Sequence, residues 1–160
     1  MIIEVEWHKP FLLSKNSRIL VDRNNLPAKI PKSVGVYFFS RKYGSSFQPL
    51  YVGETTNIRA RLRTHLNNAD IRDILRGIPL PGVPVKRGNK YFHFGTLRGK
   101  HGKLLSKRMS LVQRYMISQA IAQKSPLLNK QLTDIKTHSV VFSGPKRGRA
   151  IFQPTFNIPR

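Results

Sequence analysis

The residues that could do chemistry in this chain are two tyrosines, an arginine, a histidine and an asparagine: Tyr37, Tyr51, Arg61, His65 and Asn129. On a helix, Arg61 and His65 would leave the same face because they are four residues apart. A guanidinium fork in that place suits the oxygens of a phosphate. Each residue alone also has a structural explanation, because tyrosines fill cores, arginines face solvent or clamp backbone, and asparagines form turns. Only their arrangement along the chain can favour a functional site.

The segments around the two tyrosines predict strands. Apolar, aromatic and β-branched runs at 35–40, 49–53 and 90–96 are typical of buried strands. The first two are joined by a polar, glycine-containing loop and read as an antiparallel hairpin with a longer connection. Because both strands of this hairpin are apolar on both faces, we expect the sheet to be covered on each side.

Two helices are expected to follow from apolar residues at helical spacing. Ile58, Leu62 and Leu66 predict a helix over 57–66, capped by Thr55 or Thr56. A second stripe predicts the longest helix, over residues 105–123, ended by a following proline. We therefore expect a small α/β (α+β) fold with a three-stranded, mostly antiparallel central sheet flanked by helices.

The ends of the chain read as embellishments of this domain. A chain of 160 residues has room for one domain, so we take 1–160 as a single unit with a core at 34–130. The segments 1–33 and 131–160 are expected to be extensions, with short strands, that contribute to recognition of a partner or to oligomerisation. Residues 71–75 predict no more than a helical turn.

The order of these features resembles the GIY-YIG nuclease superfamily. The resemblance rests on Gly35-Val36-Tyr37 in one strand and Tyr51-Val52-Gly53 in the next, then a helix with Arg61 and His65, a strand, a second helix, and the exit Pro126-Leu127-Leu128-Asn129. It covers residues 34–66 and 90–130. Each tripeptide is a weak signal alone, and the order of all the features gives the resemblance its weight.

The resemblance implies a role for each of the five residues. Tyr37 would activate or contact the attacking water, and Tyr51 would order the water and the phosphate. Arg61 would stabilise charge in the transition state, His65 would relay a proton or bind phosphate, and Asn129 would hold the backbone of the site. Because a phenol with a pKa near 10 is a poor base at neutral pH, we expect Arg61 to lower the pKa of Tyr37.

One position departs from the pattern that the resemblance implies. A glutamate on the second helix would hold a catalytic Mg²⁺ (or Mn²⁺), and this chain has Gln113 there. Mg²⁺ favours anionic oxygen, so a neutral amide should bind it poorly and the chain as written should cleave weakly or not at all. Glu54 and Asp134 could replace the carboxylate only if the fold brings them near Tyr37.

Two interpretations of Gln113 are open. The chain either carries a Glu→Gln exchange that preserves shape and stops cleavage, or it is a former enzyme that now only binds nucleic acid. We favour the first because the other expected site residues are intact. The histidines show no paired spacing typical of a metal site.

The charge of the chain indicates a polyanionic partner. With 29 Lys+Arg and 7 Asp+Glu, the formal net charge is +22. Nucleic acid is the partner we expect, in the form of double-stranded DNA, and an anionic membrane surface is the rival. We assign DNA contacts to basic residues that gather in five segments: Arg41, Lys42, Arg59, Arg63, Lys86, Arg87, Arg98, Lys100, Lys103, Lys107, Arg108, Lys146, Arg147 and Arg149.

These observations favour three functions in a stated order. First is a metal-dependent, restriction-type DNA endonuclease, for which a homo-oligomer with two sites would cut both strands. Second is a non-catalytic nucleic-acid-binding protein on the same scaffold. Third is a basic RNA-associated protein of ribosomal type, which leaves the five site residues unexplained. The absence of cysteine fits a cytoplasmic location, and no apolar run reaches the roughly 18 residues of a membrane helix.

Overall fold

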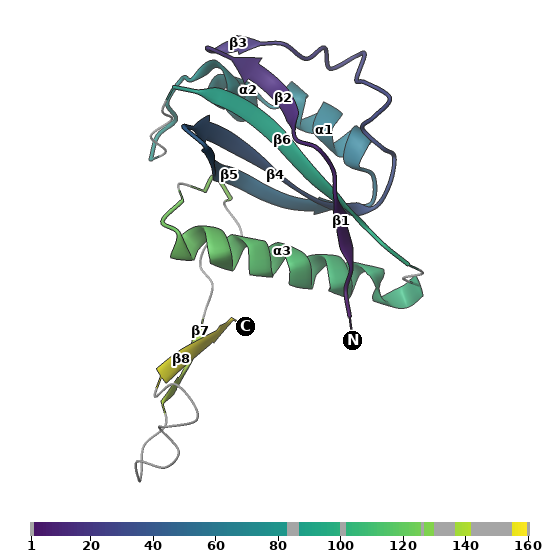
Figure 1. Ribbon diagram of the computed structural model, residues 1–160, viewed down its shortest axis with the longest axis vertical. Coiled ribbons are helices and arrows are strands. Elements are labelled where there is room, and N and C mark those ends of the chain that lie inside the picture. Colours follow the sequence, from purple (N-terminus) through teal and green to yellow (C-terminus); the bar gives the residue numbers. More distant parts are fainter. Residues whose placement is uncertain are drawn as a thin grey trace.

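A twisted antiparallel sheet is the centre of the computed structural model (Figure 1), which describes residues 2–82, 87–99, 102–125, 127–129, 137–141 and 155–159. Within these residues, six strands form the sheet in the order β3-β2-β6-β4-β5, with β1 also paired to β6. Their bounds are β1 Val5–Trp7, β2 Phe11–Lys15, β3 Arg18–Ile19, β4 Gly35–Tyr43, β5 Ser46–Thr55 and β6 Asn89–Leu97.

The mixed α/β class is confirmed, and the expectation of a three-stranded sheet is wrong. The three expected strands are β4, β5 and β6, and β4 lies between the other two. The N-terminal segment adds β1 and β2, which pair with β6 one after the other along its free edge. Leu13, Leu26 and Ile30 from this segment are buried in the core beside Tyr37. Residues 1–33 therefore build half of the sheet's strands.

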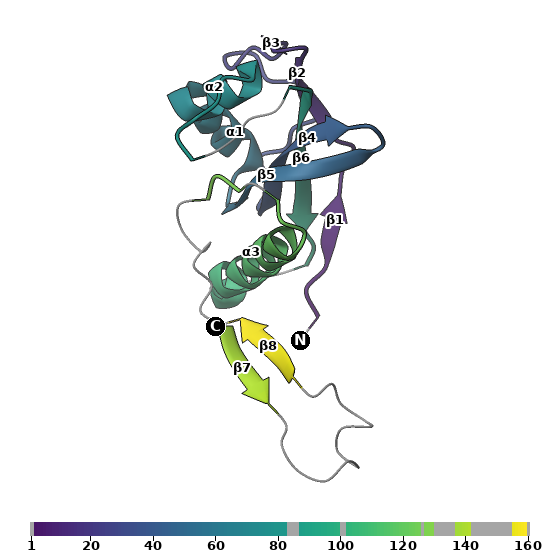
Figure 2. The same cartoon turned by 90° about the vertical axis from the view of Figure 1, so that its left-hand side faces the viewer.

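Helices cover both faces of the sheet, as the two-sided apolar strands predict (Figure 2). The helices α1 Ile58–Asn67 and α2 Ala69–Arg76 pack on one face, over Leu13, Phe39 and Phe92. Helix α3, Leu105–Ala122, packs on the other face and follows the short 3₁₀ helix η1, Gly102–Leu104.

The ends of α1 and α2 correct two expectations. The cap of α1 is Asn57, whose side chain accepts a hydrogen bond from the Ala60 N–H, so the expected cap at Thr55 or Thr56 is wrong. Helix α2 is a full helix where only a turn was expected. Asn68 caps it, and Gly77 ends it in the left-handed conformation that glycine adopts without strain.

A separate two-stranded antiparallel ribbon lies near the C-terminus. Its strands are β7 Thr137–Val141 and β8 Thr155–Pro159, and they pack principally against each other. In Figure 1 the ribbon stands apart from the sheet, on the α3 side. The expected apolar run at 151–152 lies outside the described residues. Among the helices that the structure describes, none is both long enough and apolar enough to cross a bilayer.

Candidate active site

Tyr37 and His65 form the centre of the candidate site, on the face of the sheet that carries α1. Tyr37 on β4 is fully buried, and its hydroxyl lies 2.7 Å from Nε2 of His65 on α1. The ring of Tyr51, on β5, lies 6.2 Å from the Tyr37 ring and 5.0 Å from the His65 ring. Arg61 lies one helical turn before His65 and close enough to affect the Tyr37 hydroxyl. The fold thus brings these four predicted residues together.

Gly53 makes room for the Tyr37 side chain. The two residues are opposite each other on β5 and β4, and the Tyr37 ring lies over the glycine. A Cβ on residue 53 would collide with Cζ and the hydroxyl oxygen of Tyr37. The glycine is therefore required for the position of the hydroxyl.

Burial sets the charge state of the tyrosine and the histidine. Desolvation raises the pKa of Tyr37 well above its usual value, and Tyr51 adds to this, while Arg61 only partly opposes it. The expectation that Arg61 lowers the pKa of Tyr37 overall is wrong for this reason. Burial also lowers the pKa of His65 to about 4, and the charge of Arg61 adds to the effect. At neutral pH a protonated phenol therefore faces a neutral imidazole.

Asn129 holds the open edge of β5. Its Oδ1 accepts a hydrogen bond from the Val52 N–H at 3.0 Å, and its Nδ2 donates to the Val52 carbonyl at 2.7 Å. The Leu128 N–H donates to the Leu50 carbonyl at 2.7 Å, so the segment before Asn129 follows the same edge. The amide thus replaces a neighbouring strand beside the residue that precedes Gly53.

Gln113 reaches the same carbonyl and does not fit a divalent cation. Its Nε2 lies 3.4 Å from the Val52 carbonyl oxygen, so the amide is oriented as a donor. In the described part of the chain, no group of three or more histidine, aspartate and glutamate residues could hold a metal ion. A neutral amide supplies none of the negative charge that Mg²⁺ favours.

Glu54 does not replace the missing carboxylate beside Tyr37. Successive residues of a strand point to opposite faces, so Glu54 points away from the face on which Tyr37 lies over Gly53. Burial raises the pKa of the Glu54 carboxyl, and Arg114 on α3 partly opposes this. The Glu54 side chain therefore lies on the α3 face. Asp134 lies outside the described residues.

Two of the arginines assigned to DNA contacts serve the fold. Arg59 donates hydrogen bonds to the carbonyls of Leu26, Pro27 and Ile30. Arg41 is buried, and it donates to the Arg87 carbonyl at 3.2 Å and to Gln48 Oε1 at 3.0 Å. Arg98 forms a 2.6 Å ion pair with Glu6 at the surface.

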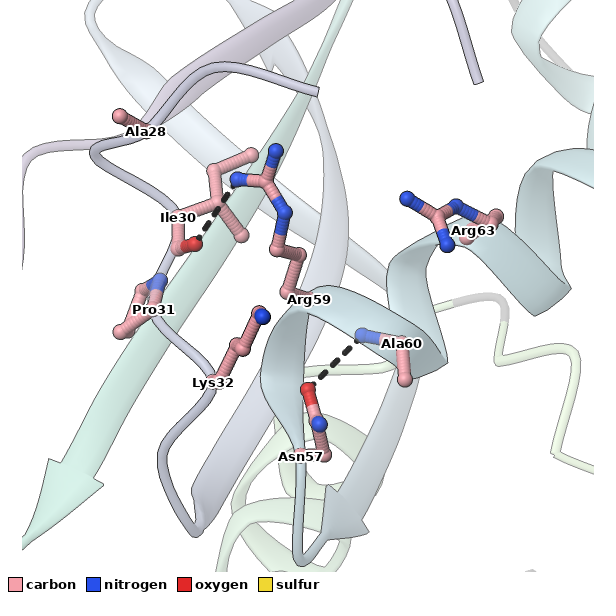
Figure 3. Close-up of a pocket in the computed structure, with 8 residues that line it drawn as sticks. All are labelled: Ala28, Ile30, Pro31, Lys32, Asn57, Arg59, Ala60 and Arg63. Atoms are coloured by element: carbon pink, nitrogen blue, oxygen red, sulfur yellow. Dashed lines mark hydrogen bonds between the residues drawn. The ribbon is translucent and has the colours of Figure 1, made fainter. Parts of the chain in front are cut away.

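Other assigned residues lie at the surface or outside the described residues. Arg63, with Lys32 and Arg59, lines a groove of about 520 Å³ between α1 and residues 28–32, shown in Figure 3. Exposed side chains belong to Lys42, Arg63, Arg87, Lys103 and Lys107, whereas Arg108 is half-buried. Lys86, Lys100, Lys146, Arg147 and Arg149 lie outside the described part of the chain.

Sequence reasoning missed an aromatic surface on the sheet face that carries α3. Phe38 and His93 are cross-strand neighbours whose rings stack 4.1 Å apart, and Trp7 and Phe47 extend the surface. The period-two alternation of the strands carried the signal, because 36 and 38 share one face and 91 and 93 share the same one.

Comparison of the chain with protein-family models, with curated proteins and with solved structures finds no match.

Proposed function

We propose that this chain has the architecture of a sequence-specific, restriction-type DNA endonuclease that hydrolyses phosphodiester bonds, and that Gln113 impairs its cleavage. The contact between the Tyr37 hydroxyl and His65 Nε2, at 2.7 Å, carries the proposal. Arg61 and Tyr51 beside this contact add a phosphate ligand and a second phenol. The resemblance to GIY-YIG nucleases assigns the same four positions to this chemistry.

The charge states of the pair favour a relay in which the tyrosine does not act as a base alone. Neutral His65 accepts the Tyr37 proton at Nε2, in the tautomer with hydrogen on Nδ1. The phenol oxygen then accepts a hydrogen bond from the attacking water. As the water oxygen bonds to phosphorus and the bond to the leaving oxygen breaks, the water proton passes to Tyr37 and the Tyr37 proton to His65. Arg61 stabilises the growing charge on the phosphate oxygens.

The divalent cation that the resemblance implies does not fit the residues at position 113, so no step is assigned to it. Bound beside a carboxylate, Mg²⁺ or Mn²⁺ would supply Lewis-acid stabilisation of the phosphate charge. Gln113 offers a neutral amide whose nitrogen faces the Val52 carbonyl. The proposal therefore expects weak or absent cleavage from this sequence. Cleavage of both strands of a duplex would need a second site, from a second copy of the chain.

A second candidate is a non-catalytic nucleic-acid-binding protein. It is favoured by one observation, that Gln113 and Asn129 meet the same Val52 carbonyl and leave no carboxylate at that edge of the site. In that case Gln113 helps to hold the edge of β5, and binding of duplex DNA would be indifferent to Mg²⁺.

The experiment that separates the two candidates is plasmid nicking and linearisation with Mg²⁺ and with EDTA. It compares the chain with its Gln113→Glu variant and with Gln119→Glu, which adds the same charge on the exposed side of α3. The nuclease proposal expects cleavage from Gln113→Glu alone, only with Mg²⁺, and a loss of about 10²-fold or more when Tyr37→Phe is added.

Absence of cleavage by Gln113→Glu, with the fold intact by circular dichroism, would overturn the nuclease proposal and favour the binding protein. Cleavage by Gln119→Glu as well would show that any added carboxylate on α3 suffices, and would remove the special role of position 113.

A further inference from the structure

Helix α3 covers only part of its face of the sheet, and aromatic rings occupy the rest. Val36, Leu97 and Met109 form the apolar contact under α3. Phe38 lies on the same face as Val36, because two residues separate them along β4, and His93 is its cross-strand neighbour on β6. Five rings from four strands lie together here, and we call them the aromatic face: Trp7, Phe38, Phe47, Tyr91 and His93.

The rings of the aromatic face form a continuous chain of contacts. Trp7 meets Phe38 edge-on at 5.6 Å, and Phe38 stacks on His93 at 4.1 Å. Phe47 then meets His93 at 4.8 Å and Tyr91 at 5.2 Å. The contacts hold the two outer rings, Trp7 and Phe47, in fixed positions, because each packs against rings anchored on β4 and β6.

Gly95 gives Trp7 its place in this chain. The two residues are paired between β6 and β1, and a Cβ on residue 95 would lie 3.2 Å from Cδ2 of the indole. That is tighter than ordinary contact, so the missing side chain lets the indole lie close to the strand. The outer ring therefore rests on backbone and on Phe38.

The two outer rings remain exposed to solvent. Trp7 is 47% exposed and Phe47 is 38% exposed, although both are large aromatic side chains on a sheet that buries its other rings well. Nζ of Lys42 lies 5.7 Å from the centre of the Phe47 ring. A ring beside an ammonium group suits a ligand with both a flat apolar face and a negative charge.

We propose that the aromatic face binds single-stranded nucleic acid, with unpaired bases stacked on Trp7 and Phe47 and the phosphates near Lys42. The net charge of +22 favours a polyanion over a second copy of the chain, because two such copies repel. A duplex is a poor fit, because its base faces are already covered by neighbouring pairs. The inference goes beyond the proposed nuclease, because no residue of the Tyr37 site takes part.

Trp7 provides a direct readout because it is the only tryptophan of the chain. The full-length protein is titrated in EDTA with oligodeoxythymidylate, with an abasic strand of equal length, with oligouridylate and with a duplex. Stacking should quench the Trp7 fluorescence with the two base-bearing single strands, and should leave it unchanged with the abasic strand. The thymidylate and uridylate arms show whether the strand is DNA or RNA. The duplex should bind through its phosphates with no quenching.

Two matched variants locate the binding. Phe47→Leu should weaken thymidylate binding about tenfold and leave the affinity for the abasic strand unchanged. Tyr115→Leu removes an aromatic side chain that is 65% exposed on α3, and should change neither affinity.

Equal affinities for thymidylate and the abasic strand, with unquenched Trp7, would overturn the proposal. So would a Trp7 signal that follows protein concentration without nucleic acid and matches dimer formation by sedimentation. Because the quenching test uses the unmodified protein, it remains decisive even if Phe47→Leu does not fold. It is also independent of cleavage, because EDTA is present throughout.

Discussion

The pair of Tyr37 and His65 shows how burial decides what a residue can do. An arginine near a phenol lowers the pKa of that phenol, and Arg61 does act in this direction on Tyr37. Burial acts in the other direction and is the larger effect, so the phenol keeps its proton. The same burial keeps His65 neutral and able to accept that proton at a 2.7 Å contact. The sequence predicted which residues meet, whereas their charge states required the structure.

The two buried histidines should make the stability of the protein depend on pH. Burial lowers the pKa of both His65 and His93 from the usual 6.5 to about 4. Between these values the unfolded chain binds more protons than the folded chain, so the free energy of unfolding should rise with pH from about 4 to about 6.5 and fall again on acidification.

Each histidine contributes up to about 1.4 kcal/mol per pH unit to this slope at 25 °C. Urea unfolding followed by circular dichroism at a series of pH values measures it. His65→Gln keeps an acceptor for the Tyr37 hydroxyl and should make the slope shallower in this window. A free energy of unfolding that stays flat from pH 4 to 6.5 would contradict the buried, neutral state of both side chains.

At the scale of elements, periodicity predicted the parts that carry the site and missed their neighbours. The expected helices at 57–66 and 105–123 correspond to α1 and α3, because their apolar stripes repeat at helical spacing over several turns. Strands β2 and β3 were not expected, because their place depends on pairing with β6 and with each other and not on a local pattern. The alternation of charges along α1 likewise did not show which arginine faces inward.

Arg59 should prove to be a structural residue that holds the loop before β4 against α1. Its guanidinium donates to the carbonyls of Leu26, Pro27 and Ile30, and the side chains of Leu26 and Ile30 are 2% and 1% exposed in the core. Arg59→Ala should lower the free energy of unfolding by about 1–3 kcal/mol, because buried carbonyls lose their donors.

Arg59→Lys should recover only part of this loss, since an ammonium group cannot reproduce the guanidinium fork. Arg63→Ala is the matched control. Arg63 lies one turn further along α1, is exposed, and donates to one carbonyl, that of Arg23, at 3.3 Å. Chemical unfolding of the three variants gives the comparison. Equal, small losses for Arg59→Ala and Arg63→Ala would show that the clamp does not stabilise the loop.

At the scale of the molecule, the fold and the charge are distributed differently along the chain. The buried side chains that the structure describes all come from residues 13–129. The ribbon of β7 and β8 packs principally on itself, and a two-stranded ribbon alone is marginally stable in water. Residues 131–160 nevertheless carry five Lys+Arg and one Asp. The sequence predicted a polyanionic partner from the total charge, but only the structure separates the basic residues that hold the fold from those at the surface.

A chain shortened to residues 1–130 should therefore keep its stability and bind DNA more weakly. It retains Asn129 and its two hydrogen bonds to Val52, so we expect the melting temperature to change by no more than a few degrees. The affinity for duplex DNA should fall, and the dependence of log K on log salt should become shallower by about 0.9 for each phosphate that the shortened chain no longer neutralises. Fluorescence anisotropy over a salt series measures both quantities. An unchanged slope would place the phosphate-binding residues in the body of the protein, at positions such as Arg61 and Arg63. A large drop in melting temperature would instead show that the C-terminal segment completes the fold.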